Sequence, residues 1–257
     1  MSKRTGNTAR RANDGIGHPF SGTAHQKSRA SPLLSVGLIL VGAFLLIAYS
    51  YRSSFVGERV ILKDQGLSCT MEVRQAIPLL KKTYGDSMRK VLHVGPETCT
   101  VVSDLFKEDT EAWGIEPYDM EDAESSCKSL LRKGIVRVAD IKFSLPYQTK
   151  SFTHVIASDA LDYLTPKYLN KTLPELARLA SDSLIIFAGV PGQPRAKVAD
   201  PSKFGRPAKL RSPSWWIRYF IQTRLKENEV AAKKFEKAAK LNSYNPGCQI
   251  FHLSSNN

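Results

Sequence analysis

The stretch KVLHVGPETCTVVSDLFK, residues 90–107, decides the fold. Its first five residues, 90–94, form the short apolar run that is typical of a buried strand. Gly95 and Pro96 then break the run, and residues 100–107 have the spacing of a helix. A buried strand that passes through a glycine turn into a helix opens a βαβ unit. The stretch therefore predicts an α/β domain with a parallel sheet.

The same alternation continues on both sides of this stretch. Further strands are predicted at residues 112–116, 135–140, 152–158, 183–188 and 248–253. Further helices are predicted at residues 69–84, 123–133, 167–180, 215–223 and 226–241. This order predicts one doubly wound, Rossmann-like sheet. Sheets of this kind bind their ligands at the carboxyl ends of the strands.

The N-terminal part of the chain contains an apolar segment, residues 33–51, without charge or proline. At about 1.5 Å per residue it spans roughly 30 Å, the thickness of a bilayer core. A cleaved signal peptide has a shorter apolar region, so we predict an uncleaved transmembrane signal anchor. The remaining predicted parts are a disordered tail at 1–32, a stalk at 52–68 and a folded domain at 69–257.

The charges beside the anchor predict its orientation. The leader, residues 1–32, carries six Lys and Arg residues, many more than the residues that follow the span. Basic flanks stay cytosolic, so the tail is expected in the cytosol and the domain in the lumen. A short span suits the thinner membranes of the early secretory route. The glycosylation sequon at Asn170, completed by Thr172, agrees with a lumenal domain.

The four cysteines, Cys69, Cys99, Cys127 and Cys248, do not have the spacing of metal ligands. A zinc site is therefore not expected. In an oxidising lumen one or two disulfides are possible, and three complete pairings exist. The sequence does not choose among these pairings, and buried free thiols remain an equally good interpretation.

Residues that directly follow the predicted strands form a candidate ligand site. Gly95 follows the first strand and allows close approach of the backbone to a ligand. Glu116 ends the second strand, where we expect an exposed carboxylate that can accept hydrogen bonds from ribose hydroxyls. Asp140 ends the third and can accept a hydrogen bond from an adenine amino group. The alternative interpretations are a tight turn at Gly95 and a solvated acid at Glu116.

The order of these motifs in residues 90–188 resembles a class I S-adenosylmethionine-dependent methyltransferase. The resemblance implies this cofactor and a methyltransferase sheet, and it implies no metal. His93, Glu97 and Cys99 depart from the family, which has an acid and glycines at these positions. A non-catalytic protein that keeps the fold therefore stays open as an alternative. The cofactor-binding residues that the resemblance implies are Gly95, Glu116, Asp140, Ile141 and Ser158.

Three longer strings are more specific. Residues 31–36 (SPLLSV), 84–96 (YGDSMRKVLHVGP) and 203–209 (KFGRPAK) resemble the plant Cotton-Golgi-related family. This resemblance implies a Golgi membrane protein that is needed for methyl-esterification of the pectin homogalacturonan. Golgi glycosyltransferases or other methyltransferases are then expected as partners.

The charge of the chain agrees with an acidic polysaccharide substrate. The net charge is +13, and residues 190–257 hold 13 basic and four acidic residues. A basic segment favours an anionic partner, although a solubilising surface is the simpler alternative, and a lumenal address argues against nucleic acid. Trp215 and Trp216 either stack on sugar rings or belong to the core. The candidate substrate-binding residues are Arg195, Lys197, Lys203, Arg206, Lys209 and Arg211.

The expected chemistry needs no catalytic side chain. A uronic acid carboxylate is already a nucleophile, so the enzyme has only to align it with the methyl donor and exclude water. One rival function is a pectin methylesterase, but the sequence has neither the short repeats of a solenoid esterase nor a GxSxG elbow. The other is a non-catalytic subunit of a Golgi pectin-modifying complex.

Overall fold

The computed structural model describes residues 68–118, 124–193 and 206–255. The chain divides into two units, Met1–Phe55 and Val56–Asn257, and every described residue belongs to the second. The predicted tail, the predicted anchor and the stalk up to residue 67 therefore lie outside the described residues. Within the described ranges, no helix has the length and apolar character needed to cross a membrane.

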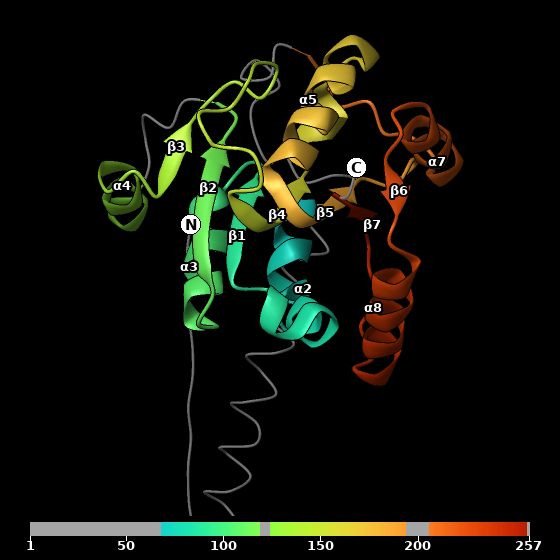
Figure 1. Cartoon of the computed structure of the whole chain (residues 1–257), viewed down its shortest axis with the longest axis horizontal. Helices are drawn as coiled ribbons and strands as arrows, with labels where there is room; N and C mark the ends of the chain where they lie inside the picture. The colour runs from blue at the N-terminus through green and yellow to red at the C-terminus, as the bar shows by residue number, and fades with distance from the viewer. Residues whose placement is uncertain (1–67, 119–123, 194–205, 256–257) are drawn as a thin grey trace, which may run out of the picture. The chain divides into compact units, whose positions relative to one another are not determined.

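The described part is built on a seven-stranded sheet with the order β3-β2-β1-β4-β5-β7-β6 (Figure 1). Strands β1 to β5 are parallel, whereas β7 runs antiparallel to both of its neighbours, β5 and β6. The α/β prediction is thus confirmed, and the parallel pairing holds except at β7. The strands are β1 (Lys90–Val94), β2 (Glu111–Glu116), β3 (Val136–Val138), β4 (Phe152–Ser158), β5 (Ala180–Ala188), β6 (Lys226–Glu227) and β7 (Gln249–Ser254).

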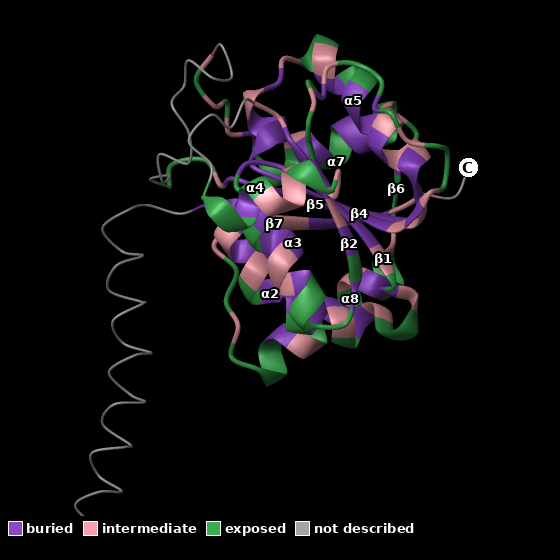
Figure 2. Ribbon diagram, turned by 90° about the vertical axis from the view of Figure 1, so that its left-hand side faces the viewer, coloured by how far each residue is buried: buried purple, intermediate pink, exposed green. Residues whose placement is uncertain are grey.

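Helices cover both faces of the sheet, as the prediction of a doubly wound fold requires. Figure 2 shows α2, α3 and α8 on one face and α5 and α7 on the other. Each face has its own hydrophobic core. The helices are α2 (Cys69–Tyr84), α3 (Thr98–Lys107), α4 (Ser125–Arg132), α5 (Pro166–Leu179), α7 (Pro213–Gln222) and α8 (Glu229–Leu241), with short 3-10 helices at Gly85–Ser87 and Ala160–Tyr163.

Polar caps explain where several helices begin. The Asn228 side chain accepts from the Ala231 amide at 3.0 Å and so starts α8. The predicted helix 226–241 is therefore too long, because Lys226 and Glu227 pair with β7 instead. Helix α2 begins at Cys69, as predicted, directly after the cap Ser68.

Two disulfides connect elements that are distant in the sequence. Cys69 at the start of α2 is bonded to Cys248, directly before β7. Cys99 in α3 is bonded to Cys127 in α4. All four cysteines lie in described residues and none is free. The structure thus selects one of the three pairings, and the interpretation as free thiols is wrong.

Candidate functional site

The candidate site lies at the carboxyl edge of the parallel strands, the upper edge of the sheet in Figure 1. The register aligns Val94 of β1 with Ile115 of β2 and with Ala157 of β4. The next residues, Gly95, Glu116 and Ser158, therefore meet at this edge. The structure brings these three predicted residues together.

Gly95 is required at its position by its neighbour rather than by a turn conformation. A Cβ atom there would lie 2.6 Å from both the carbonyl oxygen and Oγ of Ser158, and 3.3 Å from the His93 ring. Such distances are far inside van der Waals contact, so no other residue fits without movement. Gly95 thus allows the ends of β1 and β4 to close tightly against each other.

Glu116 is fully buried, with no exposed surface. Its Oε2 accepts a hydrogen bond from the Thr98 amide, 3.2 Å away, at the N-terminus of α3. It is also hydrogen-bonded to Tyr118, the second residue after β2. A solvated acid at this position, the alternative interpretation of the sequence, is therefore wrong. We also expected an exposed carboxylate at the strand end, and the burial of Glu116 corrects this.

Asp140 and Ile141 are hydrogen-bonded to Lys142 and Thr172, not to Gly95, Glu116 or Ser158. Strand β3 ends at Val138, so the predicted strand 135–140 is too long and Asp140 lies in the turn that follows. The exposed Asp140 carboxylate accepts from the Lys142 amide at 3.0 Å and pairs with the Lys142 ammonium at 3.1 Å. Ile141 is buried, and its carbonyl accepts from the Thr172 hydroxyl.

A chain of buried hydrogen bonds runs beneath the Gly95 turn. His93 Nδ1 lies 2.8 Å from Thr98 Oγ1, and His93 Nε2 lies 2.9 Å from Ser158 Oγ. Ser158 Oγ lies 2.8 Å from Thr70 Oγ1, which donates to Asp159 at 3.0 Å. Burial lowers the pKa of His93 to about 3, so the ring is neutral at physiological pH. The sequence marked His93 only as a departure from a family pattern, without this role.

Acids and tyrosines gather beside this chain of hydrogen bonds. Burial and the charges of Glu116 and Glu97 raise the pKa of Tyr118, which also lies close enough to Tyr163 to interact with it. Burial raises the pKa of Asp162 to about 7, although the Gly189 amide and the charge of Arg211 oppose the shift. The sequence reasoning missed the two tyrosines, whose signal was their place in the segments that follow β2 and β4.

The predicted substrate-binding residues separate into three groups. Arg195, Lys197 and Lys203 lie outside the described residues. The Lys209 side chain is exposed and that of Arg206 is half-buried. Arg211 is buried, and its guanidinium donates to the backbone carbonyls of Leu161, Leu164 and Lys209. Arg211 therefore holds the loop after β4 in place and is not offered to a substrate.

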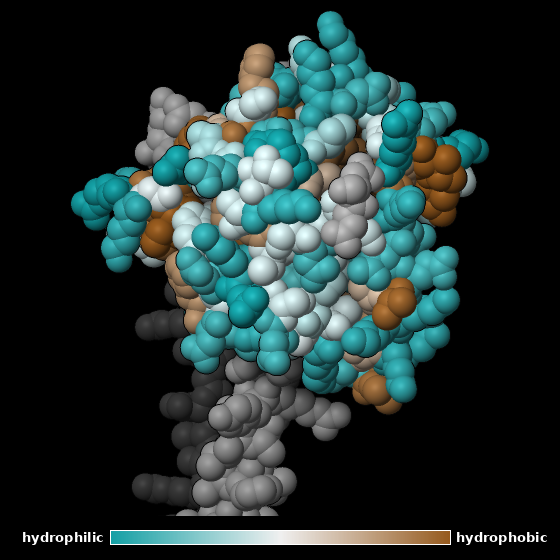
Figure 3. Space-filling view, viewed as in Figure 1, coloured by the Kyte–Doolittle hydropathy of each residue, from teal (hydrophilic) through white to brown (hydrophobic). Residues whose placement is uncertain are grey.

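The tryptophan pair belongs to the packing of α7. Trp216 is fully buried in the core. The Trp215 ring stacks on Tyr219 at 4.8 Å, and the Arg211 guanidinium lies 4.7 Å from its centre. Figure 3 shows a small hydrophobic patch over α7, where Ile217 and Ile221 are exposed. Of the two interpretations of the tryptophans, the structure supports the core.

The sequon residue Asn170 lies on the exposed surface of α5. Its side-chain oxygen accepts a hydrogen bond from the Tyr219 hydroxyl. Thr172 is buried, and its hydroxyl donates to the Ile141 carbonyl. Glycosylation of Asn170 remains a prediction.

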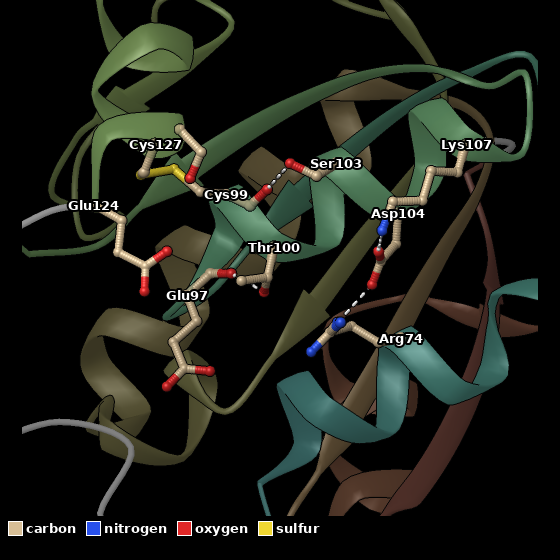
Figure 4. A pocket seen from close by; sticks show the side chains of 10 residues that line it. Arg74, Glu97, Cys99, Thr100, Ser103, Asp104, Lys107, Glu124 and Cys127 are labelled. Carbon is tan, nitrogen blue, oxygen red and sulfur yellow. Dashed lines mark hydrogen bonds and ion pairs between the residues drawn. A yellow bond between two sulfur atoms is a disulfide. The ribbon is translucent and has the colours of Figure 1, made fainter. Parts of the chain in front are cut away.

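A cavity of about 440 Å³ lies on the outer side of α3. Figure 4 shows Glu97 and Glu124 at one end of it and the Cys99–Cys127 disulfide in its wall. At the other end Asp104 pairs with both Arg74 and Lys107. The described residues contain no cluster of side chains able to hold a metal ion.

Comparison with known proteins identifies close relatives. No family model matches the chain. Two Arabidopsis thaliana proteins match over 257 residues, with 98% of each chain covered. They are "Probable pectin methylesterase CGR2", at 63% identity, and "Probable pectin methylesterase CGR3", at 64% identity.

Solved structures are more distant. A SAM dependent methyltransferase from Archaeoglobus fulgidus is 15% identical, with a TM-score of 0.47, and the match covers 77% of this chain and 98% of the other. A geranyl diphosphate methyltransferase in complex with GPP and sinefungin is also 15% identical, with a TM-score of 0.45 over 71% and 77% of the two chains. The identity and coverage of the Arabidopsis relatives show that the chain belongs to the Cotton-Golgi-related family.

Proposed function

We propose that this chain is a Golgi methyltransferase that transfers a methyl group from S-adenosylmethionine to galacturonic acid carboxylates of homogalacturonan. The proposal is carried by the carboxyl edge of the sheet, where Gly95, Glu116 and Ser158 meet beside acids and tyrosines. The Arabidopsis relatives are named probable pectin methylesterases. A pectin methylesterase acts on the methyl ester of pectin, and the proposed transfer would form the same ester.

The residues at this edge fit a cationic nucleoside. The carboxylates of Glu97 and Glu116 attract positive charge, and the faces of Tyr118 and Tyr163 favour a sulfonium. Glu116 would hold the ribose, with a ribose hydroxyl taking the place of the Tyr118 hydroxyl. Asp140 and Ile141 would hold the adenine. When bound, S-adenosylmethionine supplies an electrophilic methyl group.

The substrate carboxylate needs no base, because it is ionised at Golgi pH. The protein then has only to hold one uronate against the methyl donor and to exclude water. Lys209 and Arg206 would pair with neighbouring uronates, together with Arg195 and Lys197. Methylation removes the charge of the uronate, so the esterified product is held less tightly.

A methylesterase is the first alternative function. The Ser158–His93 pair, at 2.9 Å, has the composition of a hydrolytic nucleophile and base. Both side chains are fully buried, and Gly95 packs directly against Ser158 Oγ. An ester carbonyl therefore has no approach to this hydroxyl, and the geometry favours the transferase.

The test uses the full-length protein in detergent micelles. We expect S-adenosylmethionine to bind in calorimetry, and its labelled methyl group to appear in low-ester polygalacturonate. Methanol release from high-ester pectin without S-adenosylmethionine would instead identify an esterase. Absence of cofactor binding would support the second alternative, a non-catalytic subunit of a pectin-modifying complex.

We also propose that the protein is a single-pass type II protein of the Golgi membrane, with its domain in the lumen. The two disulfides support this address, because such bonds persist in oxidising compartments and are rare in the cytosol. The basic leader and the apolar segment 33–51 support the orientation.

A further inference from the structure

Only one order of protons makes every contact between neighbouring side chains in the buried chain beneath Gly95 a hydrogen bond. The members of this buried chain are Thr98, His93, Ser158, Thr70 and Asp159, each no more than 1% exposed. A carboxylate only accepts, so Thr70 uses its single hydroxyl proton to donate to Asp159. The 2.8 Å contact between Thr70 and Ser158 then requires Ser158 to donate.

This order fixes the tautomer of His93. Ser158 has used its proton toward Thr70, so its oxygen must accept from His93 across the 2.9 Å contact. The ring therefore carries its proton on Nε2, and its bare Nδ1 accepts the single proton of the Thr98 hydroxyl at 2.8 Å, in preference to the His93 carbonyl at 3.3 Å. Every proton in the chain points toward Asp159. Hydrogen bonds aligned in this way polarise and strengthen one another.

This chain of buried hydrogen bonds also forms the floor of the candidate site. Asp159 accepts from the amides of Cys69 and Thr70 and so connects the start of α2 to the end of β4. At the other end, Thr98 donates its amide to Glu116. Ser158 and His93 lie directly against Gly95. A shift of either side chain therefore moves the turn at which the proposed cofactor binds.

We propose that His93 is a positioning residue, held as the Nε2–H tautomer by Thr70 and Asp159, that sets the Gly95 turn and the Thr98 end of α3 for ligand binding. His93 does not touch the ligand and acts through Ser158 and Thr98. The tautomer also prevents His93 from serving as a base toward Ser158, because the nitrogen that faces the hydroxyl is already protonated.

Removal of one hydroxyl on α2 should reverse the order. In Thr70→Val, Ser158 loses its acceptor, while Asp159 keeps its donors Ser68, Cys69 and the residue 70 amide. Ser158 then donates to His93 Nε2, and the ring proton moves to Nδ1. Thr98 can accept this proton, because its own hydroxyl has a second acceptor, the His93 carbonyl at 3.3 Å. A change at residue 70 should thus change the tautomer at residue 93.

The measurement is nitrogen-15 NMR of full-length protein labelled selectively at histidine, with the His93 signal identified by its loss in His93→Gln. The wild type should show the Nε2–H tautomer and Thr70→Val the Nδ1–H tautomer. Thr70→Ser, which keeps the hydroxyl, should restore the wild-type pattern. Thr83→Val is the matched control, because Thr83 is a buried threonine of the same helix that bonds only within it, to the Leu79 carbonyl.

An Nδ1–H ring in the wild type, or the same tautomer in Thr70→Val, would overturn the proposal. The second readout rests on the proposed function: Thr70→Val should weaken S-adenosylmethionine binding about threefold to tenfold more than Thr83→Val does. Equal binding by both variants would remove the positioning role even if the tautomer changes. If the wild type binds no cofactor, the proposed function fails, while the NMR result still decides the proton order.

Discussion

Glu116 is fully buried at the end of β2, and its removal should therefore affect both binding and stability. Glu116→Ala takes away the acceptor of the Thr98 amide. A buried amide without an acceptor costs roughly 1–3 kcal/mol of folding free energy. Loss of one charged hydrogen bond to the ribose should weaken cofactor binding by about one to two decades. Urea denaturation and calorimetry measure the two effects.

Glu116→Gln is the matched control. It keeps an oxygen for the Thr98 amide, so most of the stability should return, while the charge stays absent. Cofactor affinity equal to the wild type in both variants would take Glu116 out of the binding site.

Asp162 should give the protein an unusual dependence on pH. Burial raises its pKa to about 7, so the folded protein holds a proton that the unfolded chain releases above about pH 4. The contribution of this group to stability therefore falls as the pH rises from about 4 to 7, by roughly 1.4 kcal/mol per unit. Asp162→Asn should become progressively more stable than the wild type across this range in urea denaturation. The exposed acid Asp86 gives the control, and parallel pH curves for Asp162→Asn and Asp86→Asn would contradict the expectation.

At the scale of elements, local sequence patterns predicted those helices and strands whose formation depends on residues adjacent in the sequence. The predicted bounds of α2, β1 and β4 agree with the structure, because an apolar strand or an amphipathic helix is visible in its own residues. Strand β6 was missed, since its two residues pair only through the distant β7. The disulfide pairing could not be predicted for the same reason, because spacing in the sequence does not show that Cys69 lies beside Cys248.

The candidate site divides in a similar way. The meeting of Gly95, Glu116 and Ser158 was predictable because strand ends of a parallel sheet converge on one edge. His93 and Thr70 were not, because their roles follow from side chains that meet only in the folded protein. Arg211 was misjudged, since the charge of a residue does not indicate whether backbone carbonyls bind it.

The basic segment after β5 should bind substrate through its exposed members. Arg206→Gln combined with Lys209→Gln should weaken binding of low-ester polygalacturonate, and less so near ~1 M salt, where the screening length falls to about 3 Å from about 8 Å at physiological ionic strength. Cofactor affinity should not change. Sedimentation or surface binding with low-ester and high-ester pectin measures this.

Arg211→Gln is the contrasting variant for this segment. Because the Arg211 guanidinium holds backbone carbonyls, its loss should reduce stability by roughly 1–3 kcal/mol. Unchanged acceptor binding in the double variant would leave Arg206 and Lys209 as a solubilising surface.

At the scale of the whole molecule, three buried histidines predict loss of stability in acid. Burial lowers the pKa of His93 to about 3 and that of His252 to about 4, and it lowers that of His154. Below about pH 6.5 the unfolded chain binds protons that the folded protein does not accept. Stability should therefore fall as the pH decreases from about 6.5 to 4, because His93 and His252 are two groups against the single opposing group Asp162. Urea denaturation at stepped pH tests this, and a flat profile would contradict the burial of these rings.

The proposed orientation predicts protection of the domain inside vesicles. A tag at the C-terminus should resist protease in intact microsomes and be digested after detergent is added, because the domain would lie in the lumen. Digestion without detergent would reverse the proposed topology.

The disulfide between Cys69 and Cys248 also has a consequence for the order of events during synthesis. The two cysteines are 179 residues apart, which at ~5–20 residues per second corresponds to roughly 9 to 36 seconds of synthesis. Cys99 and Cys127, only 28 residues apart, are both made within this interval. Cys69 therefore meets two cysteines that belong to each other before its own partner exists. Correct maturation requires an oxidant or isomerase that leaves Cys69 reduced, or releases it again, until the last strand has been made.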